Sequence, residues 1–468
     1  MKRGGARPLL AFLVRRPAPR RLVVRAVLPP GVRDVMARLE EHGHQAQLVG
    51  GCVRDLLLGR VPHDWDVATD ALPERVLGLF PGAQPTGIAC GTVTVPRKAA
   101  SRGVEVTTYR SEGPYSDRRH PDRVSFVGSL DEDLKRRDVT INAMALDRRG
   151  RLYDPAGGLS DLRAGLLRAV GDPAQRFAED ALRLMRVVRL FAETGFSIAP
   201  RTRDAIGGAA ALLACVAAER VRDELLRVLA SPRAGEGLEL LRATGLLAVV
   251  WPAAAAAPAE TWTRAVGAVG RAAAAGEGLG LRLSALYWGV LGSGPHAAAQ
   301  AREEMQRLRI DSDTAARVSD LLRWLPALRC QPRRAPVELR RAAARAGRAT
   351  FRDLPRLCRV AGPPPPPAPG AADGAVAAQC RACPAARAAG LIARGRCPLS
   401  AAELPVGGAD VMRVLGLGPG PEVGRALAEL LDHVLARPSL ARRRDLLRLL
   451  AALRAEAAAS GRRGHDKA

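Results

Sequence analysis

The stretch Leu48-Val49-Gly50-Gly51-Cys52-Val53-Arg54-Asp55, followed a few residues later by His63-Asp64-Trp65-Asp66, decides the fold. The apolar residues before Gly50-Gly51 predict a strand, and two consecutive glycines predict a tight turn into a helix. Short β-branched runs at 67–69, 92–95 and 104–109 predict three more strands, and Pro73 predicts the start of a helix. Residues 31 to 155 are therefore expected to form a small α/β domain.

Three acidic residues follow this turn in a pattern that indicates metal chemistry. Asp64 and Asp66 are two apart, so on a strand their side chains would project to the same side. Two carboxylates that close repel each other unless a cation lies between them, and Mg²⁺ prefers oxygen ligands while leaving sites for substrate phosphates. The sequence predicts Asp64 and Asp66 as metal ligands, with Glu105 as a third catalytic carboxylate on a second strand.

Gly50 and Gly51 have a matching purpose at the turn. Without side chains, their backbone N–H groups can approach a triphosphate at the beginning of the helix. Arg54 is placed to contact the same phosphates. An ordinary tight turn and a solvated acidic pair are the alternatives, but the order of Gly-Gly, Asp-x-Asp and a strand Glu favours a catalytic site.

These segments resemble the head of the class II tRNA nucleotidyltransferase/poly(A) polymerase family. The segment 136–143 resembles the family's second motif, which implies that Arg137, Asp138 and Asn142 contact the ribose and phosphates of the nucleotide. The segment 154–162 resembles its third motif, a hinge. The resemblance is almost continuous from residue 45 to 230 and looser from 398 to 450.

Two further segments resemble motifs of the same family. Residues 179–186, Glu-Asp-Ala-Leu-Arg-Leu-Met-Arg, resemble the nucleotide-selecting motif, which implies that Asp180, Arg183 and Arg186 bind the nucleotide. Glu219-Arg220 with Glu224 resembles the helix that supports this motif. The implied fold is a polymerase-beta-like α/β head, a mixed sheet with helices, followed by an all-α neck, body and tail.

Hydrogen-bond chemistry supports the selecting role independently. Asp180 and Arg183 are three residues apart, so on a helix they would share one face. A carboxylate accepts from an exocyclic amino group, and a guanidinium donates to ring nitrogens or carbonyls, which suits cytosine and adenine. Uracil and guanine would leave mismatched groups, each costing about 1–3 kcal/mol when buried. The alternative is a surface ion pair of little consequence.

The chain is strongly basic, with 72 Lys and Arg against 47 Asp and Glu and a net charge of +25. Such a charge favours a polyanionic partner, although codon bias toward Arg would produce the same composition. The Arg-rich segments 333–348 and 442–448 are candidates for phosphate contacts or are simply solvated helix faces. The loop 110–124 resembles a family loop that helps the switch from C to A addition; an ordinary mobile loop is the alternative.

The cysteines and the apolar segments indicate which compartment and which partners to expect. The eight cysteines fit reduced thiols in a cytoplasmic protein, and zinc bound by Cys380, Cys383 and Cys397 is the weaker alternative. No apolar segment is long enough for a membrane helix. The stretch 283–291 lacks the His-Asp pair of the hydrolase domain found in some relatives of the family, so no second hydrolase is expected.

The expected organisation runs from an α/β head to helical segments. In chain order we expect a basic, disordered N-terminal extension (1–29), the nucleotidyltransferase head (30–165), a helical neck for nucleotide selection and RNA binding (166–230), a helical body (231–360), a Pro- and Ala-rich linker (361–397), a helical tail (398–455) and a disordered C-terminus (456–468).

The predicted function is template-independent addition of C and/or A, from CTP and ATP, to the 3′ end of tRNA, with Mg²⁺ as cofactor and pyrophosphate as product. A poly(A) polymerase or an enzyme that adds only A would share the same head. An inactive RNA-binding relative and a small-molecule nucleotidyltransferase are less favoured alternatives. No DNA or membrane partner is expected, and the sequence leaves the oligomeric state open.

Overall fold

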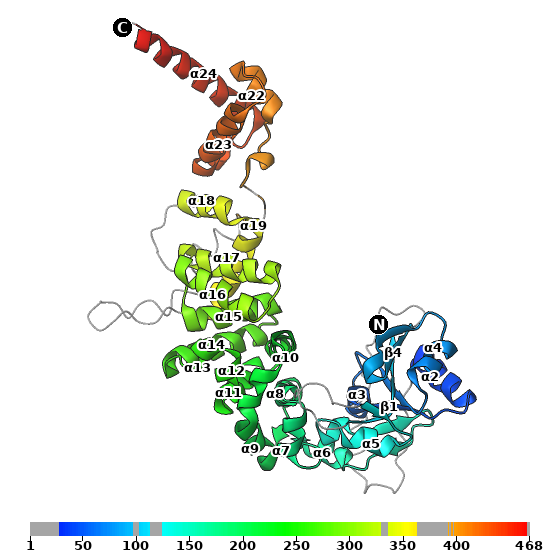
Figure 1. Cartoon of the computed structure of the whole chain (residues 1–468). Coiled ribbons are helices and arrows are strands. Elements are labelled where there is room, and N and C mark those ends of the chain that lie inside the picture. The colour runs from blue at the N-terminus through cyan, green and yellow to red at the C-terminus, as the bar shows by residue number, and fades with distance from the viewer. Residues whose placement is uncertain are drawn as a thin grey trace, which may run out of the picture. The chain divides into compact units, whose positions relative to one another are not determined.

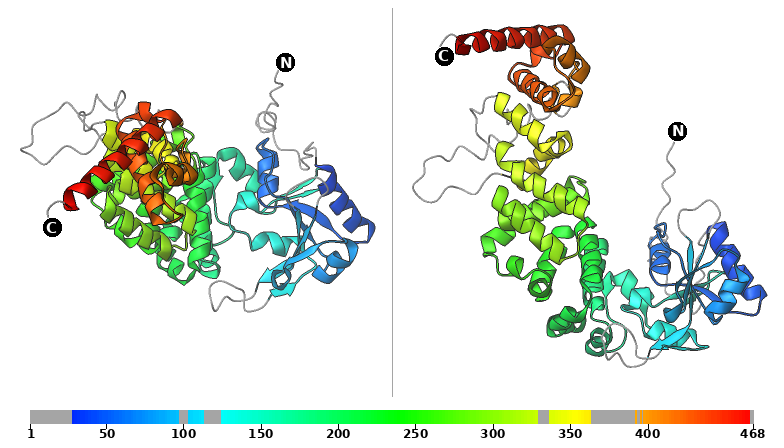
Figure 2. Two further views of the ribbon diagram at one scale, coloured as in Figure 1. Left: turned by 90° about the horizontal axis from the view of Figure 1, so that it is seen from above. Right: turned by 45° about the horizontal axis from the view of Figure 1, so that its top comes forward.

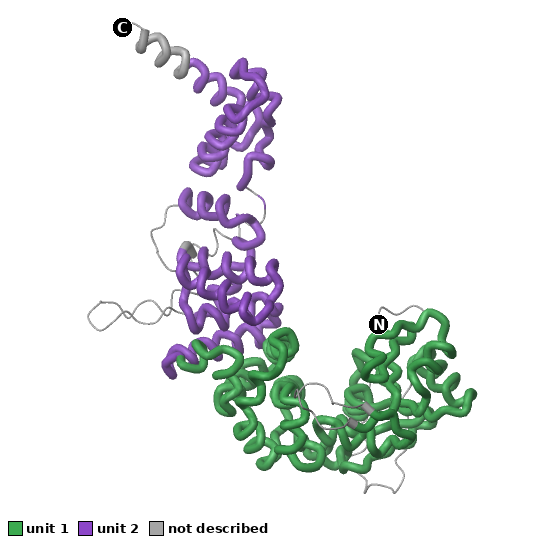
Figure 3. The backbone as a smooth tube through the Cα atoms, in the orientation of Figure 1, with its two compact units in different colours: residues 1–256 green, residues 257–468 purple. Residues whose placement is uncertain are grey.

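The computed structural model describes residues 28–96, 103–112, 124–328, 336–362, 392, 395 and 397–465. The chain divides into two compact units, residues 1–256 and 257–468 (Figure 3). The division between the two units falls inside the expected body, 231–360, and the expected domain limits stay a prediction. Within the described ranges, no helix combines the length and apolar character needed to cross a membrane.

A mixed seven-stranded sheet forms the head, as the sequence predicted, in the order β3-β4-β5-β2-β1-β8-β9. Only the pairing of β2 with β5 is parallel, and the other neighbours in this sheet are antiparallel. The strands of the sheet are β1 (Ala46–Val49), β2 (Asp66–Thr69), β3 (Gln84–Gly87), β4 (Thr92–Val95), β5 (Val104–Thr108), β8 (Ala145–Asp147) and β9 (Leu152–Tyr153).

The alternation of buried and partly exposed side chains along a strand explains which face of the strand packs into the core. In β4 the two valines, Val93 and Val95, are buried, while Thr92 and Thr94 are partly exposed. A period of two places one set of side chains in the core and the other on the opposite face of the sheet. The predicted strand at 92–95 is confirmed with the same limits, since β-branched residues suit a half-buried pleated surface.

Helices α2 (Pro30–Glu41) and α4 (Pro73–Leu79) pack beside each other against the sheet (Figures 1 and 2). The buried residues of α2, which are Val32, Val35, Met36 and Leu39, recur at helical spacing and form one face. The other short elements of the head are η1 (Ile88–Cys90), α3 (Gly51–Leu57), α5 (Leu130–Lys135), η2 (Thr140–Asn142), α6 (Gly158–Ala164) and the hairpin of β6 (Arg110–Glu112) with β7 (Val124–Phe126).

The neck begins with two helices. Asp172 caps α7 (Pro173–Glu179), since its carboxylate accepts from the Gln175 backbone N–H at 3.0 Å. The chain then leaves the helix at Asp180 and re-enters it in α8 (Leu182–Thr194). The remaining elements of the first unit are β10 (Leu166–Leu167), β11 (Ser197–Ile198), α9 (Pro200–Ala209), η3 (Ala210–Cys215), α10 (Ala218–Ala230), α11 (Ala234–Ala243), α12 (Leu246–Val250) and α13 (Pro252–Ala255).

The second unit is helical in its described parts. Its elements are α14 (Ala259–Ala274), α15 (Leu279–Leu291), α16 (Pro295–Arg307), α17 (Ser312–Leu328), α18 (Pro336–Ala346), α19 (Arg348–Ala361), η5 (Ala401–Glu403), α22 (Gly408–Leu415), α23 (Pro421–Ala436), η6 (Pro438–Leu440) and α24 (Arg443–His465). Helix α24 continues through residue 465, where disorder was expected from 456. Most of the expected N-terminal extension and linker, including Cys380 and Cys383, lies outside the described residues.

Candidate active site

A cavity of about 600 Å³ lies in the first unit, between the head sheet and the neck helices α8 and α10. Every predicted site residue lines it except Asp64 and Arg54. The lining residues are Val49, Gly50, Gly51, Asp66, Cys90, Thr92, Glu105, Thr107, Arg110, Arg136, Arg137, Asp138, Asn142, Asp180, Arg183, Arg186 and Arg220. Residues far apart in the sequence therefore form a single pocket.

Asp66 and Glu105 meet in this cavity because their strands are direct neighbours. Asp66 begins β2 and lies opposite Glu105 in the parallel register of β2 with β5. Burial raises the pKa of the Asp66 carboxyl to about 6, and the nearby negative charge of Glu105 acts in the same direction. The two carboxylates thus form the electrostatically strained pair that a cation would relieve.

Asp64 differs from the expectation. It lies in a bend before β2, not on the strand, and its side chain is exposed. Its charge still contributes to the raised pKa of Asp66, so the two carboxylates are near enough to interact. No group of three or more His, Cys, Asp or Glu side chains among the described residues has the arrangement of a metal site. Assignment of Asp64 and Asp66 as metal ligands therefore stays a prediction.

Gly50 lines the cavity at the tight turn that the sequence predicted. Its φ of +77° belongs to the region that favours glycine, and α3 begins at the next residue. A Cβ atom at Gly50 would lie 2.9 Å from Nη1 of Arg137 and 3.6 Å from Oδ2 of Asp66. Any side chain here would therefore displace the arginine and intrude between it and the carboxylate.

Arg54 is engaged by its neighbours and does not line the cavity. Its Nε donates to Oδ1 of Asp55 at 2.9 Å, and its Nη1 donates to Oδ1 of Asn142 at 2.9 Å. Because the amide of Asn142 lines the cavity, Arg54 sets how that amide is oriented. The direct contact of Arg54 with phosphates stays a prediction.

Asp138 is the buried centre of a second group. Arg186 donates to its Oδ2 at 2.8 Å, while the Asn142 amide and the Val139 backbone N–H donate to its Oδ1 at 3.2 and 2.8 Å. Burial favours the neutral acid, but Arg186 and these hydrogen bonds prevail and hold the pKa of Asp138 well below its usual range. Asp138 in turn raises the pKa of Arg186, so both groups stay charged.

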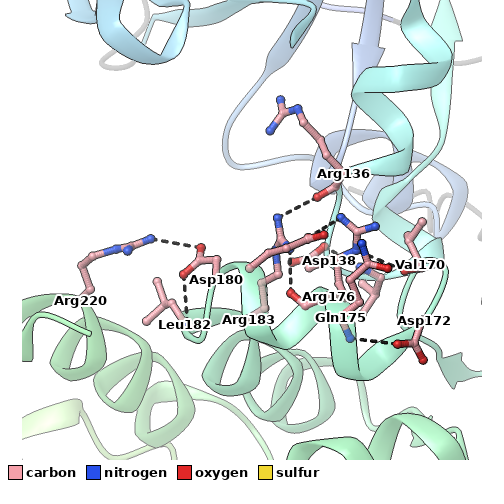
Figure 4. A network of polar contacts seen from close by, with 12 residues as sticks. Arg136, Asp138, Val170, Asp172, Gln175, Arg176, Asp180, Leu182, Arg183 and Arg220 are labelled. Carbon is pink, nitrogen blue, oxygen red and sulfur yellow. Dashed lines mark hydrogen bonds and ion pairs between the residues drawn. The ribbon is translucent and has the colours of Figure 1, made fainter. Parts of the chain in front are cut away.

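Asp180 and Arg183 reach the cavity from different backbone conformations (Figure 4). Asp180 lies in the break between α7 and α8, not on a helix as expected, and its Oδ1 accepts from the Leu182 N–H at 3.1 Å. Its Oδ2 accepts from Nη2 of Arg220 in α10 at 3.4 Å. The break turns the carboxylate away from the helix axis, which the i,i+3 argument could not anticipate.

The guanidinium of Arg183 is held on several sides. Nη2 donates to the Arg136 carbonyl at 2.9 Å, and Nη1 donates to the Arg176 carbonyl at 2.8 Å and to Oε2 of Glu179 at 2.7 Å (Figure 4). Only 6% of the residue is exposed. These contacts fix the orientation of the guanidinium at the cavity, which a base-reading group requires.

Helix α10 supports this arrangement, as the family resemblance implied. Arg220 contacts Asp180, and Glu224 forms an ion pair with Arg189 of α8, with Oε2 at 2.7 Å from Nε. The buried Glu224 therefore joins α10 to α8, and Arg220 joins α10 to the break before α8.

Several lining residues escaped the sequence analysis. Thr92 and Thr107 face each other across β4 and β5 with 3.1 Å between their hydroxyl oxygens, and Arg110 donates to the Cys90 carbonyl. The alternation of the two predicted strands was a signal for the threonines. Nothing in the sequence pointed to Cys90, because only the turn at η1 brings it to the cavity.

The chain matches models of two domain families. Residues 46–168 match the poly(A) polymerase head domain, and residues 195–257 match a probable RNA- and SrmB-binding site of polymerase A. The CCA-adding enzyme of Geobacillus stearothermophilus is 48% identical over 212 residues, which cover 45% of this chain and 52% of that enzyme. The CCA-adding enzyme of Leuconostoc mesenteroides is 48% identical over 208 residues, covering 44% and 51%. The matched sequence thus spans about half the length of these curated relatives.

Solved structures extend the similarity over more of the chain. The Bacillus stearothermophilus CCA-adding enzyme in complex with CTP has a TM-score of 0.68 and 31% sequence identity, covering 87% of this chain and 94% of that one. The Thermotoga maritima CCA-adding enzyme complexed with tRNA is 18% identical with a TM-score of 0.54, covering 95% and 98%, which is a likeness of fold alone. On its head motifs, its fold and this coverage, the chain belongs to the class II tRNA nucleotidyltransferase/poly(A) polymerase family.

Proposed function

We propose that this protein adds C and A, from CTP and ATP, to the 3′ end of tRNA without a template and releases pyrophosphate. One observation carries the proposal: a single cavity contains both the acidic pair Asp66 and Glu105 and the Asp180/Arg183 pair. The first pair suits phosphoryl chemistry, and the second suits the reading of a base. Similarity to CCA-adding enzymes, one of them solved with CTP, supports the same reaction.

Enzymes of this family generally use divalent metal ions. For this chain we propose Mg²⁺, held by Asp64 and Asp66 with Glu105 assisting. The fit rests on the raised pKa of Asp66, which reports acidic groups close enough to destabilise one another when ionised. Bound there, the ion would lower the pKa of the RNA 3′-hydroxyl and stabilise the leaving pyrophosphate.

The residues around the carboxylates are proposed to hold the nucleotide. Gly50 and Gly51 leave room for phosphate oxygens at the start of α3, and Arg137 lies beside Gly50. Asn142, oriented by Arg54, would contact the ribose, and the Asp138–Arg186 pair would support it. Held in line with the RNA 3′-hydroxyl, the α-phosphate would react chiefly through positioning and charge stabilisation.

Asp180 and Arg183 are proposed to select cytosine and adenine. Asp180 would accept from the exocyclic amino group, because its contact with Arg220 is long, at 3.4 Å, and one oxygen can be shared. Arg183 would donate to the acceptor edge of the base. Uracil and guanine present a carbonyl and a ring N–H instead, and each mismatch would cost about 1–3 kcal/mol in a buried site.

The test is incorporation of labelled CTP, ATP, UTP or GTP into defined acceptors. The acceptors are tRNA lacking CCA, tRNA ending in CC, an unrelated RNA and a DNA oligonucleotide. The proposal predicts C then A addition to the first tRNA, A addition to the second, and little reaction with UTP, GTP or DNA. Long A tails on any RNA would instead support the poly(A) polymerase alternative, and A addition only to the CC-ending tRNA would indicate an A-adding enzyme. If tRNA is the substrate, we propose that the protein acts in the cytoplasm.

A further inference from the structure

Asp133 contacts two arginines of the cavity lining and was not suggested by the sequence. It belongs to the short helix α5, and its side chain is only 1% exposed. Its Oδ1 accepts from Nη2 and Nε of Arg136 at 2.6 and 3.0 Å, and its Oδ2 accepts from Nη2 of Arg137 at 2.9 Å. One buried carboxylate therefore engages two arginines, and both of these arginines line the cavity.

The segment held by Asp133 contacts both halves of the site. Nη1 of Arg137 lies beside Gly50, because a Cβ atom at Gly50 would be 2.9 Å from it. This guanidinium therefore lies where the phosphates are proposed to bind. The carbonyl of Arg136 accepts from Nη2 of Arg183 at 2.9 Å, which orients the proposed base-reading group. Movement of residues 136 and 137 would thus alter both the phosphate end and the base end of the proposed nucleotide site.

The charge of Asp133 also has an electrostatic consequence. Burial favours protonation of this carboxyl, but Arg137 and Arg136 outweigh that effect and hold its pKa below the usual range, so it is ionised at neutral pH. Arg137 is close enough to Asp66 to lower the pKa of that carboxyl. Asp66 is therefore a cavity carboxylate within electrostatic reach of Arg137.

We propose that Asp133 is a positioning residue that holds Arg136 and Arg137 toward the nucleotide and keeps Arg137 from pairing with Asp66. The inference rests on the proposed function, because it assumes that this cavity binds a nucleoside triphosphate. Asp133 itself does not line the cavity, so it acts through the two arginines.

The experiment compares Asp133→Asn with Asp131→Asn in the full-length protein. Asp131 is a matched control on the same helix, since it is partly exposed to solvent and accepts from the Tyr153 hydroxyl at 2.7 Å. The dissociation constant for labelled CTP is measured by equilibrium dialysis with divalent metal, and KM and kcat are measured on tRNA lacking CCA. We expect Asp133→Asn to raise the dissociation constant and the KM for CTP at least tenfold, with kcat within threefold, while Asp131→Asn matches the unaltered protein.

A double-variant cycle with Arg137→Lys separates positioning from a general structural role. If Asp133 acts through Arg137, Asp133→Asn must have a smaller effect in the Arg137→Lys background than alone. Effects that multiply, or a loss of thermal stability with unchanged CTP binding, would overturn the inference. If the unaltered protein binds CTP but adds nothing to tRNA, the proposed function fails while the binding comparison still decides the role of Asp133.

A conservative variant covers the case in which Asp133→Asn does not fold, as judged by circular dichroism. Asp133→Glu keeps the negative charge with which Arg136 and Arg137 pair. We expect its dissociation constant for CTP to be within threefold of that of the unaltered protein. A tenfold rise in a folded Asp133→Glu protein would contradict the proposal.

Discussion

Arginines serve different purposes in the two units of this molecule. In the first unit, Arg137 and Arg186 pair with the buried carboxylates of Asp133 and Asp138 and still line the cavity. In the second unit, Arg340 donates to the carbonyls of Leu435 and Ala436 at the end of α23. Buried carboxylates in the first unit hold arginines at the cavity, whereas arginines in the second unit join helices by donating to helix-end carbonyls.

The sequence could not separate these uses. The segments 333–348 and 442–448 were candidates for RNA phosphate contacts. In the structure, Arg341 forms a paired contact with Asp432, Arg348 donates to the Cys397 carbonyl, and Arg443 donates to Asp410. These arginines stabilise the fold of the second unit. RNA binding by the other arginines of the two segments stays a prediction.

The largest expected effect is on catalysis in the first unit. Asp66→Asn should lower kcat for C addition by about 10³-fold or more, because the site would lose a charge that the proposed metal requires. The exposed Glu74 of α4 offers a matched control, and Glu74→Gln should leave kcat unchanged. The measurement is single-turnover incorporation of labelled CTP into tRNA lacking CCA. Equal rates for the two variants would remove Asp66 from the active site.

The next effect concerns nucleotide choice. Asp180→Asn replaces an acceptor by an amide that can donate as well, so rejection of uracil should weaken. We expect the ratio of kcat/KM for CTP over UTP to fall about 10- to 100-fold, which corresponds to one mismatched buried group. Asp223→Asn, an exposed change on the supporting helix α10, is the control. Unchanged discrimination in Asp180→Asn would mean that the base is read elsewhere.

A third effect follows from the pKa of Asp66. Because this pKa is raised to about 6 in the folded protein, the carboxyl favours folding when protonated, and that contribution is lost as the pH rises toward and through 6. Asp66→Asn cannot ionise, so without metal it should be more stable than the unaltered protein above pH 6, by about 1–3 kcal/mol. Below pH 4 the gain should vanish. Thermal denaturation of both proteins with a chelator across pH 4 to 8 measures this gain in stability. A gain that does not vary with pH would show that ionisation of Asp66 is not its cause.

The smallest expected effect is in the second unit. Arg340→Gln should destabilise the protein by about 1 kcal/mol, since it removes hydrogen bonds to the end of α23. RNA affinity, measured by filter binding at two salt concentrations, should change less than twofold. The exposed Arg352 of α19 provides the control, and Arg352→Gln should leave stability unchanged. Weaker RNA binding by Arg340→Gln at unchanged stability would show that this arginine binds RNA and does not join helices.

Local patterns predicted much of the fold and of the cavity. The limits of β4 depend on side-chain alternation, which neighbouring residues determine. Asp180 was misplaced because a helical pattern continues across the break between α7 and α8. Asp133 was missed because an Asp with Arg three and four residues later resembles a surface ion pair, and only tertiary packing buries it.

The most direct test of the central claim is binding of Mn²⁺, as a spectroscopic substitute for Mg²⁺, followed by electron paramagnetic resonance with CTP present. The account predicts a tight site in the unaltered protein that Glu74→Gln retains and that Asp64→Asn and Asp66→Asn each weaken at least tenfold. Equal Mn²⁺ binding by all four proteins would contradict the assignment of these carboxylates to the metal.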